Sequence, residues 1–486
     1  MATELEPYPT YKDSGVPWLG QVPEQWDIKR NKLFLREVNQ RSEDGTEELL
    51  TVSQYTGVTR RRERSLGEGD LLTHATSLVG HKRVSPGDLV VNIMLAWNGS
   101  LGVSSLAGIV SPAYCVYRAG PQSEPRFLHY LYRTPLFTGA FKTVSTGVVD
   151  SRLRLYPDVF FDMSSLLPPL PEQTAIVRYL DHADRKVRHA IHARQQLIKL
   201  LTEQKQAIIQ RAVMRGLDPS VRLKPSGVLW LGDVPEHWTV VRLRHLLACP
   251  LINGLFKKKD SYGSGVPLVN VTDIYQDDFT IVCSTLDLVV ANADEVRTFR
   301  VQPGDILFVR SSLKLEGTGQ SALVSKCDES TVFECHLVRA RPNQLRVSSR
   351  FLTLFLNSPS ARSSLVAHAN TVTMSTLPQG AMKSISVPVP PLCEQEAILA
   401  AVDRDTASVM RAIDTSHREI DLLRQYRTRL IADVVTGKLD VRGVKVPDDE
   451  TDVLSEELES IDDVDAADQG DDTAEGNSES SAEENA

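Results

Sequence analysis

The chain has 486 residues, 41% of them hydrophobic, so it is long enough for two or more domains that each bury an ordinary core. Its net charge of −9 is misleading: residues 447–486 hold 17 Asp or Glu and no Lys or Arg, which leaves 46 acidic against 54 basic residues in a body able to bind a polyanion. The sequence has no apolar run long enough to cross a bilayer and no signal peptide, and its six scattered Cys residues form no zinc-ligand or disulfide pattern, so we expect a cytoplasmic protein with free thiols.

The first predicted element is a compact β-rich module over residues 1–167. Its short runs of Val, Ile, Thr, Tyr and Phe are broken by Gly, Pro, Asn and Asp, as is typical of short strands joined by turns. A long-helix region follows over 168–217. The stretch from Glu172 to about Arg215 contains no Pro or Gly, and apolar residues recur there at alternating spacings of four and three. Prolines before the helix and Gly216 after it indicate its two ends.

The same plan then occurs a second time. "SGVPWLGQVPEQW" (14–26) returns as "SGVLWLGDVPEHW" (226–238), and "PPLPEQTAIVRYLD", which begins the first helix, returns as "PPLCEQEAILAAVD". An internal repeat of this kind predicts two homologous halves and an α+β fold class. The second half consists of a β-rich module over 218–389 and a long-helix region over 390–440.

The two long helices carry matching apolar seams at a constant separation in the sequence, so they align without a gap. An amphipathic helix of about 40 residues cannot bury its stripe alone, and the obvious partner is the other helix. Pairing them would give an intramolecular pseudo-dimer with an approximate two-fold axis. The alternative is that each helix packs only on its own module. The predicted helix-pairing residues are Ile176, Leu180, Val187, Ile191, Ile198, Leu201 and Ile208, and Ile398, Val402, Val409, Ile413, Ile420, Leu423 and Leu430.

The final segment, 441–486, is predicted to be an acidic, disordered tail. It has no aromatic residue and too little apolar surface to offset the entropy of the chain. Its role is either solubility or competition with nucleic acid for a basic surface.

Motifs that carry catalysis are missing from the sequence. It has no P-loop, no HExxH and no GxSxG, and its eleven His residues form no metal-ligand pattern. A chain of this size without such motifs is predicted to bind rather than catalyse. Two modules held apart by a spacer suit duplex DNA, because each can enter one major groove. Two alternatives stay open: a coiled-coil scaffold protein and an autonomous DNA-binding regulator.

Several motifs also resemble a known family. "GDLVVNIMLAWNGSLGVS" (87–104), the two "WLGxVPExW" openings and the paired "PPLxEQxxI" helix starts are similar to the specificity (S) subunit of type I restriction-modification systems. The resemblance covers nearly all of 10–440, twice over and in the right order. It implies that the modules are target recognition domains, each reading one half of an asymmetric bipartite DNA site. It also implies that the helices form an antiparallel coiled coil that sets the spacing between the half-sites.

The resemblance further implies partners. Two modification subunits would dock on the helices, bind S-adenosylmethionine and methylate one adenine N6 per half-site, on opposite strands. A restriction subunit with ATP-driven, magnesium-dependent translocation is a further partner. This chain would itself hold no cofactor or metal, would perform no catalysis and would not touch a membrane.

The candidate DNA-binding residues follow from the chemistry of the ligand. Phosphates are bound by Lys, Arg and backbone amides, and base edges by Arg, Lys, Asn and Gln on loops. Each choice has a plainer alternative: basic runs are often solvated surface, Trp97 could anchor a core or turn, and Ser145 and Thr373 could end strands. The candidates in the first module are Arg60, Arg61, Arg62, His81, Lys82, Arg83, Trp97, Asn98, Ser145 and Thr146, and in the second Lys257, Lys258, Lys259, Arg310, Lys314 and Thr373.

Overall fold

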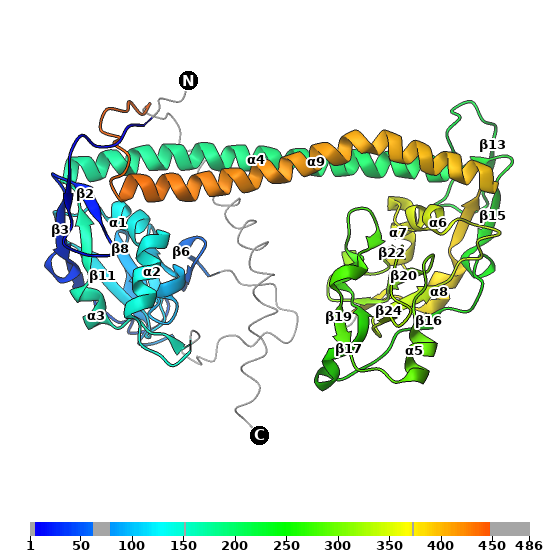
Figure 1. Ribbon diagram of the computed structural model, residues 1–486, viewed down its shortest axis with the longest axis horizontal. Coiled ribbons are helices and arrows are strands. Elements are labelled where there is room, and N and C mark those ends of the chain that lie inside the picture. Colours follow the sequence, from blue (N-terminus) through cyan, green and yellow to red (C-terminus); the bar gives the residue numbers. More distant parts are fainter. Residues whose placement is uncertain (1–4, 62–77, 150–151, 372–373, 448–486) are drawn as a thin grey trace. The chain divides into compact units, whose positions relative to one another are not determined.

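The computed structural model describes residues 5–61, 78–149, 152–371 and 374–447, apart from the side chains of Lys259 and Ser284. The chain forms two compact units (Figure 1). Unit 1 joins the chain up to Gln195 with the chain from His417 onward, and unit 2 runs from Gln196 to Ser416. Arg62, Thr373 and the acidic segment from residue 448 lie outside the described residues.

Two long helices are shared between the units, α4 (Leu170–Arg215) and α9 (Leu392–Val435). In unit 1 the first part of α4 lies beside the last part of α9, where Asp184 pairs with Arg427 and Arg194 with Glu419. The partner number falls as the residue number rises, so the helices are antiparallel, as predicted. In unit 2 the last part of α4 lies beside the first part of α9, and both contribute to one core.

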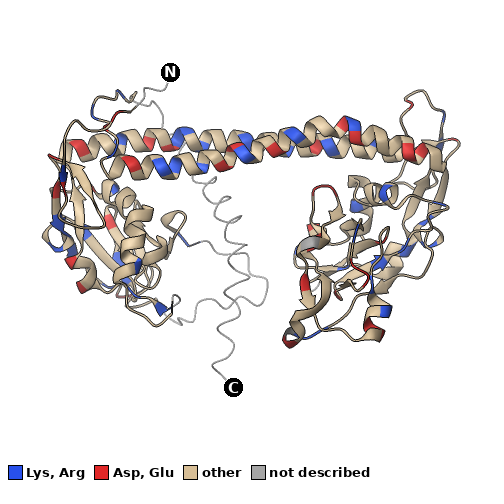
Figure 2. Cartoon of the chain, in the orientation of Figure 1, with Lys and Arg blue, Asp and Glu red and all other residues tan. Residues whose placement is uncertain are grey.

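The charges of the two helices complement each other. Helix α4 contains nine Lys or Arg and four Asp or Glu, whereas α9 contains six Lys or Arg and eight Asp or Glu. Figure 2 shows these residues interspersed along both helices. Because α4 is net positive and α9 net negative, their pairing is electrostatically favoured.

Most of the predicted helix-pairing residues are buried. Near the end of α4, however, the apolar contact shifts by one position, because Ile209 is buried and Ile208 only partly so. A straight α-helix has 3.6 residues per turn, so a strict seven-residue pattern rotates by about 20° per heptad relative to its partner. The buried residues of the set are Ile176, Leu180, Val187, Ile191, Ile398, Val402, Val409, Ile413, Ile420 and Leu430, and the partly buried ones are Ile198, Leu201, Ile208 and Leu423.

The module of unit 1 is built on an antiparallel four-stranded sheet with the strand order β4-β11-β8-β9. Three short helices follow it in the chain, and a core that contains Trp26 and Phe127 lies between them, the sheet and the long helices. The sheet strands are β4 (Leu35–Glu37), β8 (Asp88–Val91), β9 (Leu101–Val103) and β11 (Cys115–Ala119); the paired strands are β1 (Tyr11–Asp13) with β2 (Gln21–Pro23), β3 (Asp27–Arg30) with β12 (Ser164–Leu167), β5 (Leu50–Ser53) with β6 (Gly57–Arg60), and β7 (Lys82–Val84) with β10 (Gly108–Val110); the helices are α1 (Pro125–Tyr132), α2 (Pro135–Val144) and α3 (Pro157–Asp162).

The module of unit 2 has the matching sheet, extended by one parallel strand to the order β16-β24-β20-β22-β18. Two further three-stranded sheets surround it. The sheet strands are β16 (Ile252–Asn253), β18 (Thr280–Ile281), β20 (Ile306–Val309), β22 (Ser321–Val324) and β24 (Leu337–Ala340); the others are β13 (Leu223–Pro225) with β14 (Asp233–Pro235), β15 (Thr239–Arg242) with β27 (Ser386–Val389), β17 (Tyr262–Val269) with β19 (Asp287–Val289) and β23 (Val332–Phe333), and β21 (Ser311–Ser312) with β25 (Asn370–Thr371) and β26 (Ser375–Thr376); the helices are α5 (Ala293–Phe299), α6 (Ser349–Leu356), α7 (Pro359–Val366) and α8 (Gln379–Ser384).

The internal repeat extends to buried ion pairs. In unit 1 the Arg118 guanidinium donates to both carboxylate oxygens of Asp88 at 2.7 Å, and in unit 2 Arg341 donates to Asp305 at 2.6 and 2.7 Å. Each pair joins two neighbouring strands, β8 with β11 and β20 with β24. The "PGD" segments of the sequence therefore supply the carboxylate that fixes the centre of each sheet.

The chain remains ordered past residue 440, where the tail was predicted to begin. The Asp440 amide donates to the Glu6 carbonyl at 2.8 Å, and Val441 is buried in the core of unit 1. The Arg442 guanidinium lies 5.0 Å from the ring centroid of Tyr8. Residues 441–447 thus cover the start of the chain. Among the described residues, no helix is long and apolar enough to span a membrane.

Candidate nucleic-acid interface

A glutamine in each "PPLxEQ" motif fastens a module to its helix. Gln173 donates from Nε2 to the Pro168 and Gln122 carbonyls at 2.7 and 3.1 Å and accepts from the Glu124 amide at 2.8 Å. Gln395 makes the same three bonds in unit 2, to Pro390, Arg346 and Ser348. The glutamine thus ties the segment before α1 or α6 to the start of α4 or α9.

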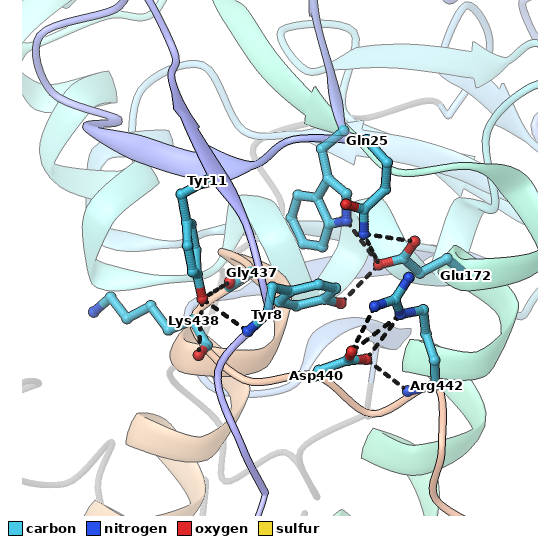
Figure 3. A network of polar contacts seen from close by, with 9 residues as sticks. Tyr8, Tyr11, Gln25, Glu172, Gly437, Lys438, Asp440 and Arg442 are labelled. Carbon is cyan, nitrogen blue, oxygen red and sulfur yellow. Dashed lines mark hydrogen bonds and ion pairs between the residues drawn. The ribbon is translucent and has the colours of Figure 1, made fainter.

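The preceding glutamate binds the repeated tryptophan in each unit. Figure 3 shows Glu172 with Tyr8 and Gln25 beside its carboxylate. In unit 1, the Trp26 indole N–H and the Tyr8 hydroxyl each donate to Glu172 Oε1 at 2.7 Å. Burial and the Glu172 carboxylate raise the pKa of Tyr8, so its hydroxyl stays protonated as a donor. In unit 2, Trp238 donates to Glu394 at 3.1 Å. The repeated openings of the sequence therefore anchor each module to a helix start.

In unit 1, two turns and a loop lie together at one edge of the module. The 53–57 turn joins β5 to β6, the 92–100 turn joins β8 to β9, and a loop that is described over 145–149 and 152–155 follows α2. The Leu155 amide donates to the Ile93 carbonyl at 2.8 Å, and a Cβ added to Gly99 would lie 3.8 Å from the Gln54 carbonyl oxygen. We call these three segments recognition edge 1.

Trp97 and Asn98 lie on recognition edge 1. The Trp97 indole N–H donates to the Met94 carbonyl at 3.1 Å, and the Lys142 ammonium lies 5.2 Å from its ring centroid. Asn98 Oδ1 accepts from the Ser100 amide and hydroxyl at 3.2 and 2.9 Å. Within the described residues, the Asn98 amide nitrogen makes no hydrogen bond, so it is available as a donor to a base or phosphate.

Ser145 and Thr146 begin the loop after α2. The Ser145 hydroxyl donates to the Phe141 carbonyl at 2.7 Å and so ends α2, whereas Thr146 is exposed and pairs with the backbone of Arg154. Val148, next in the loop, is 97% exposed. The sequence did not predict Val148 or Lys142 as candidates. Lys142 lies beside Trp97 only because α2 packs there, and no local sequence motif indicates that contact.

The basic candidates of the first module are not on recognition edge 1. Arg60 ends β6, away from the 53–57 turn, and pairs with Glu48 at 3.2 Å, and Arg83 pairs with Glu47 at 2.6 Å. The Lys82 side chain is only 8% exposed and pairs with Glu37 at 3.4 Å. Its burial in this ion pair argues against a phosphate contact from Lys82, and DNA contact by this residue stays an untested prediction.

The two other candidates near these residues have no assigned role. Arg61 is exposed. His81 is partly buried, and its Nδ1 atom has no hydrogen-bond partner among the described residues. For Arg60, Arg61, His81 and Arg83, DNA contact stays a prediction.

Unit 2 has a corresponding edge. The 310–320 segment between β20 and β22 lies against the β25–β26 hairpin, since the Leu377 amide donates to the Arg310 carbonyl at 2.8 Å and the Thr318 hydroxyl to the Ser375 carbonyl at 3.2 Å. We call these segments recognition edge 2. The Leu377–Arg310 bond is the counterpart of the Leu155–Ile93 bond in unit 1.

Of the candidates in the second module, Arg310 and Lys314 lie on recognition edge 2. Arg310 is partly buried and Lys314 is exposed. Lys257 is elsewhere and pairs with Glu295, near the start of α5, at 2.9 Å; this contact lowers the pKa of Glu295. Lys258 is exposed. The side chain of Lys259 and the whole of Thr373 lie outside the described residues.

Among the described residues, no group of three His, Cys, Asp or Glu could hold a metal ion, and the six cysteines are unpaired. Two edges of loops and turns, each on a rigid sheet, remain the surfaces best suited to a ligand.

Comparison with known proteins identifies a family domain. Residues 235–413 match the type I restriction modification DNA specificity domain. The EcoKI specificity subunit of Escherichia coli K12 is 22% identical over 408 residues, which are 79% of this chain and 83% of that protein. The StySPI specificity subunit of Salmonella potsdam is 22% identical over 401 residues, with the same two shares. The predicted resemblance to specificity subunits is thereby confirmed.

A solved structure has the same fold. A chain from a structure of a type I R-M system is 18% identical, and the match covers 86% of this chain and 99% of that chain with a TM-score of 0.58. The predicted α+β class, with two β-rich modules and two packed long helices, is confirmed by this match and by the elements described above.

Proposed function

We propose that this chain, which carries the type I restriction-modification DNA specificity domain, is the non-catalytic DNA-recognition subunit of such a complex. The observation that carries the proposal is the repeated edge: in both units, a turn after the central strand is bonded to a loop that follows the second short helix. Two equivalent edges on one chain suit two half-sites on duplex DNA.

The bipartite site should be asymmetric. Recognition edge 1 presents Asn98 and Thr146, with Lys142 of α2 beside it, whereas recognition edge 2 presents Arg310 and Lys314. Because side chains on loops read the edges of bases, different residues at equivalent places select different bases. The paired helices α4 and α9 would then fix the number of base pairs between the half-sites.

The long helices also suit two copies of one partner. Leu200 on α4 and Leu422 on α9 are 222 residues apart, as are the seam residues, and they are 62% and 63% exposed. An exposed leucine at the same position of both helices offers the same docking contact twice. The partners would be two adenine N6 methyltransferase (modification) subunits in the cytoplasm, joined by restriction subunits where the system has them. S-adenosylmethionine, ATP and magnesium would be bound by those partners.

The test is to co-express the chain with the modification subunit encoded beside it and to map N6-methyladenine across a host genome by single-molecule sequencing. We expect one new split motif with a methylated adenine in each half, on opposite strands. No new methylation from a demonstrably assembled complex would contradict the proposal and favour a scaffold protein. Tight, sequence-specific DNA binding by the chain alone would favour an autonomous regulator.

A further inference from the structure

One arginine joins the two turns of recognition edge 1. Arg133 directly follows α1. Among the described residues, its guanidinium donates hydrogen bonds to five backbone carbonyls. Nη1 donates to Leu101 at 2.8 Å and to Ser53 and Gly99 at 3.3 Å, and Nη2 donates to Gln54 at 2.9 Å and Tyr55 at 2.6 Å. Three of these carbonyls belong to the 53–57 turn, one to the 92–100 turn and one to β9, which follows it.

The same helix supports these segments one turn earlier. His129 accepts a hydrogen bond at Nδ1 from the Val103 amide at 3.2 Å. A Cβ added to Gly57 or Gly102 would lie 3.0 or 3.1 Å from the imidazole ring, so the backbone of β6 and β9 approaches His129 closely. Helix α1 therefore holds the base of both turns, with Arg133 at the end nearest their tips.

The contacts of Arg133 suit a positioning role. A charged donor bound to a carbonyl makes a stronger bond than a neutral one, and guanidinium geometry fixes several acceptors in one plane. Loops that read bases must hold their side chains to within about 0.5 Å of the productive geometry. Without the guanidinium, neighbouring carbonyls of two turns would face each other with no donor between them, and the turns would separate.

Unit 2 uses a different residue for the corresponding contact. The position that matches Arg133 is Asn357. The Ser321 amide donates to Asn357 Oδ1 at 3.1 Å, and Asn357 Nδ2 donates to the Ser321 carbonyl at 2.7 Å. The turn is held instead by Arg362 on α7, which donates to the Thr318 carbonyl at 2.7 Å and to the Glu316 carbonyl. Each edge thus has its own arginine, and a substitution of one leaves the other intact.

We propose that Arg133 is the positioning residue that sets the sequence specificity of the first module, by holding the 53–57 and 92–100 turns together. This inference rests on the proposed DNA-recognition function. Arg362 supports recognition edge 2 in a simpler way, because both carbonyls that it binds, Glu316 and Thr318, belong to the 310–320 segment. Neither side chain reads a base; each acts through the backbone that its guanidinium holds.

The experiment compares methylation by the co-expressed full complex containing Arg133→Met, Arg133→Lys or Arg362→Met. Methionine keeps the length of the side chain and removes all its donors, whereas lysine keeps the charge but cannot reach five carbonyls at once. The matched control is Arg126→Met, an equal change on α1 at a residue that pairs with Asp181 at 2.8 Å and touches neither turn.

We expect Arg133→Met to relax at least one position of the first half-site, with a loss of discrimination of about 5- to 150-fold, the usual range for one base pair. Arg133→Lys should give a smaller loss at the same position. The second half-site should stay unchanged, and Arg362→Met should give the opposite pattern. Arg126→Met should leave both half-sites as in the parent.

Other outcomes have distinct meanings. Unchanged half-sites in a folded Arg133→Met complex overturn the inference, as does equal weakening of all sequences with a lower melting temperature, which a purely structural residue would give. If Arg133→Met does not fold, unchanged specificity in Arg133→Lys overturns it instead. Absence of any split motif for the parent complex contradicts the proposed function, before Arg133 is considered.

Discussion

The glycine after each long helix provides a prediction with a built-in control. Gly437 ends α9 with φ +77°, and an added Cβ would lie 2.6 Å from Pro23 Cγ, closer still to Pro23 Cδ, and 3.2 Å from Trp26. Gly216 ends α4 with φ +73°, but its added Cβ would come only within 3.3 Å of Glu394 and Trp238. Both glycines adopt the left-handed backbone conformation, and only Gly437 also lacks space for a Cβ atom.

The expected loss of stability combines the cost of a left-handed backbone with the cost of crowding by the added Cβ. An L-residue in the left-handed region costs about 1–2 kcal/mol, and overpacking adds about 1–3 kcal/mol. Gly437→Ala should therefore lower the free energy of local opening in unit 1 by about 2–5 kcal/mol, and Gly216→Ala should lower that in unit 2 by about 1–2 kcal/mol.

Native-state hydrogen exchange of the full chain measures both effects. The amides of Glu24 and Glu236 are equivalent reporters, because they donate to the carbonyls of Thr10 and Arg222 at 3.2 and 2.8 Å. Each 1.4 kcal/mol corresponds to about a tenfold faster exchange where opening is at equilibrium. Equal acceleration of the two reporters by the two substitutions would refute the reasoning, because it would show that Pro23 moves aside at no cost.

Three further predictions concern pH, DNA contact and docking. Burial lowers the pKa of His129, and so do the cations of Arg133, Arg126, Arg427 and Arg188. Unit 1 should therefore have its full stability above the unfolded pKa of about 6.5 and lose up to about 1.4 kcal/mol per pH unit below it. Thermal melting at pH 7.5 and 5.5 should show this loss in the parent and much less of it in His129→Gln. Lys314→Ala should weaken binding to all duplexes alike and reduce the salt slope by about one, whereas Lys82→Ala should leave the slope unchanged, as binding titrations at several salt concentrations would show. Leu200→Asp and Leu422→Asp should each remove one modification subunit from the complex and the double variant both, so native mass spectra that keep two subunits in every variant would contradict the docking proposal.

The sequence predicted the repeat, both long helices and their pairing, because those features depend on local periodicity and on motifs that recur. The antiparallel direction of the pairing came from the resemblance to specificity subunits. Ten of the fourteen seam residues are buried, and Ile198, Leu201, Ile208 and Leu423 are partly buried. At Ile208 the neighbouring Ile209 is buried instead, because the helix rotates relative to the heptad pattern. The start of the tail was placed too early, because Val441 is buried by contacts with residues more than 400 positions away in the chain.

The interface was harder to predict than the fold. A basic run shows the charge of a segment and not its partners. Lys82, Arg83 and Arg60 are paired with Glu37, Glu47 and Glu48, none of which belongs to the same basic run. The residues that hold the turns, such as Arg133, make their contacts with backbone carbonyls, which have no sequence signature. Trp97 and Asn98 lie in the turn between β8 and β9, where Gly99 follows them with a positive φ, and their contact with DNA stays a prediction.

The two halves of the chain share the contacts of the scaffold but differ in the contacts that support the turns. Contacts within the scaffold recur residue for residue: Glu172 and Glu394 bind a tryptophan, and Asp88 and Asp305 bind an arginine. The contacts that hold the turns do not recur, since an arginine after α1 serves one edge and an arginine on α7 serves the other. If specificity depended only on the side chains that face DNA, the supports beneath the turns could have stayed alike. That the supports differ as well indicates that each edge needs its own backbone geometry, and this is the physical reason why the half-site read by one module cannot be deduced from the other.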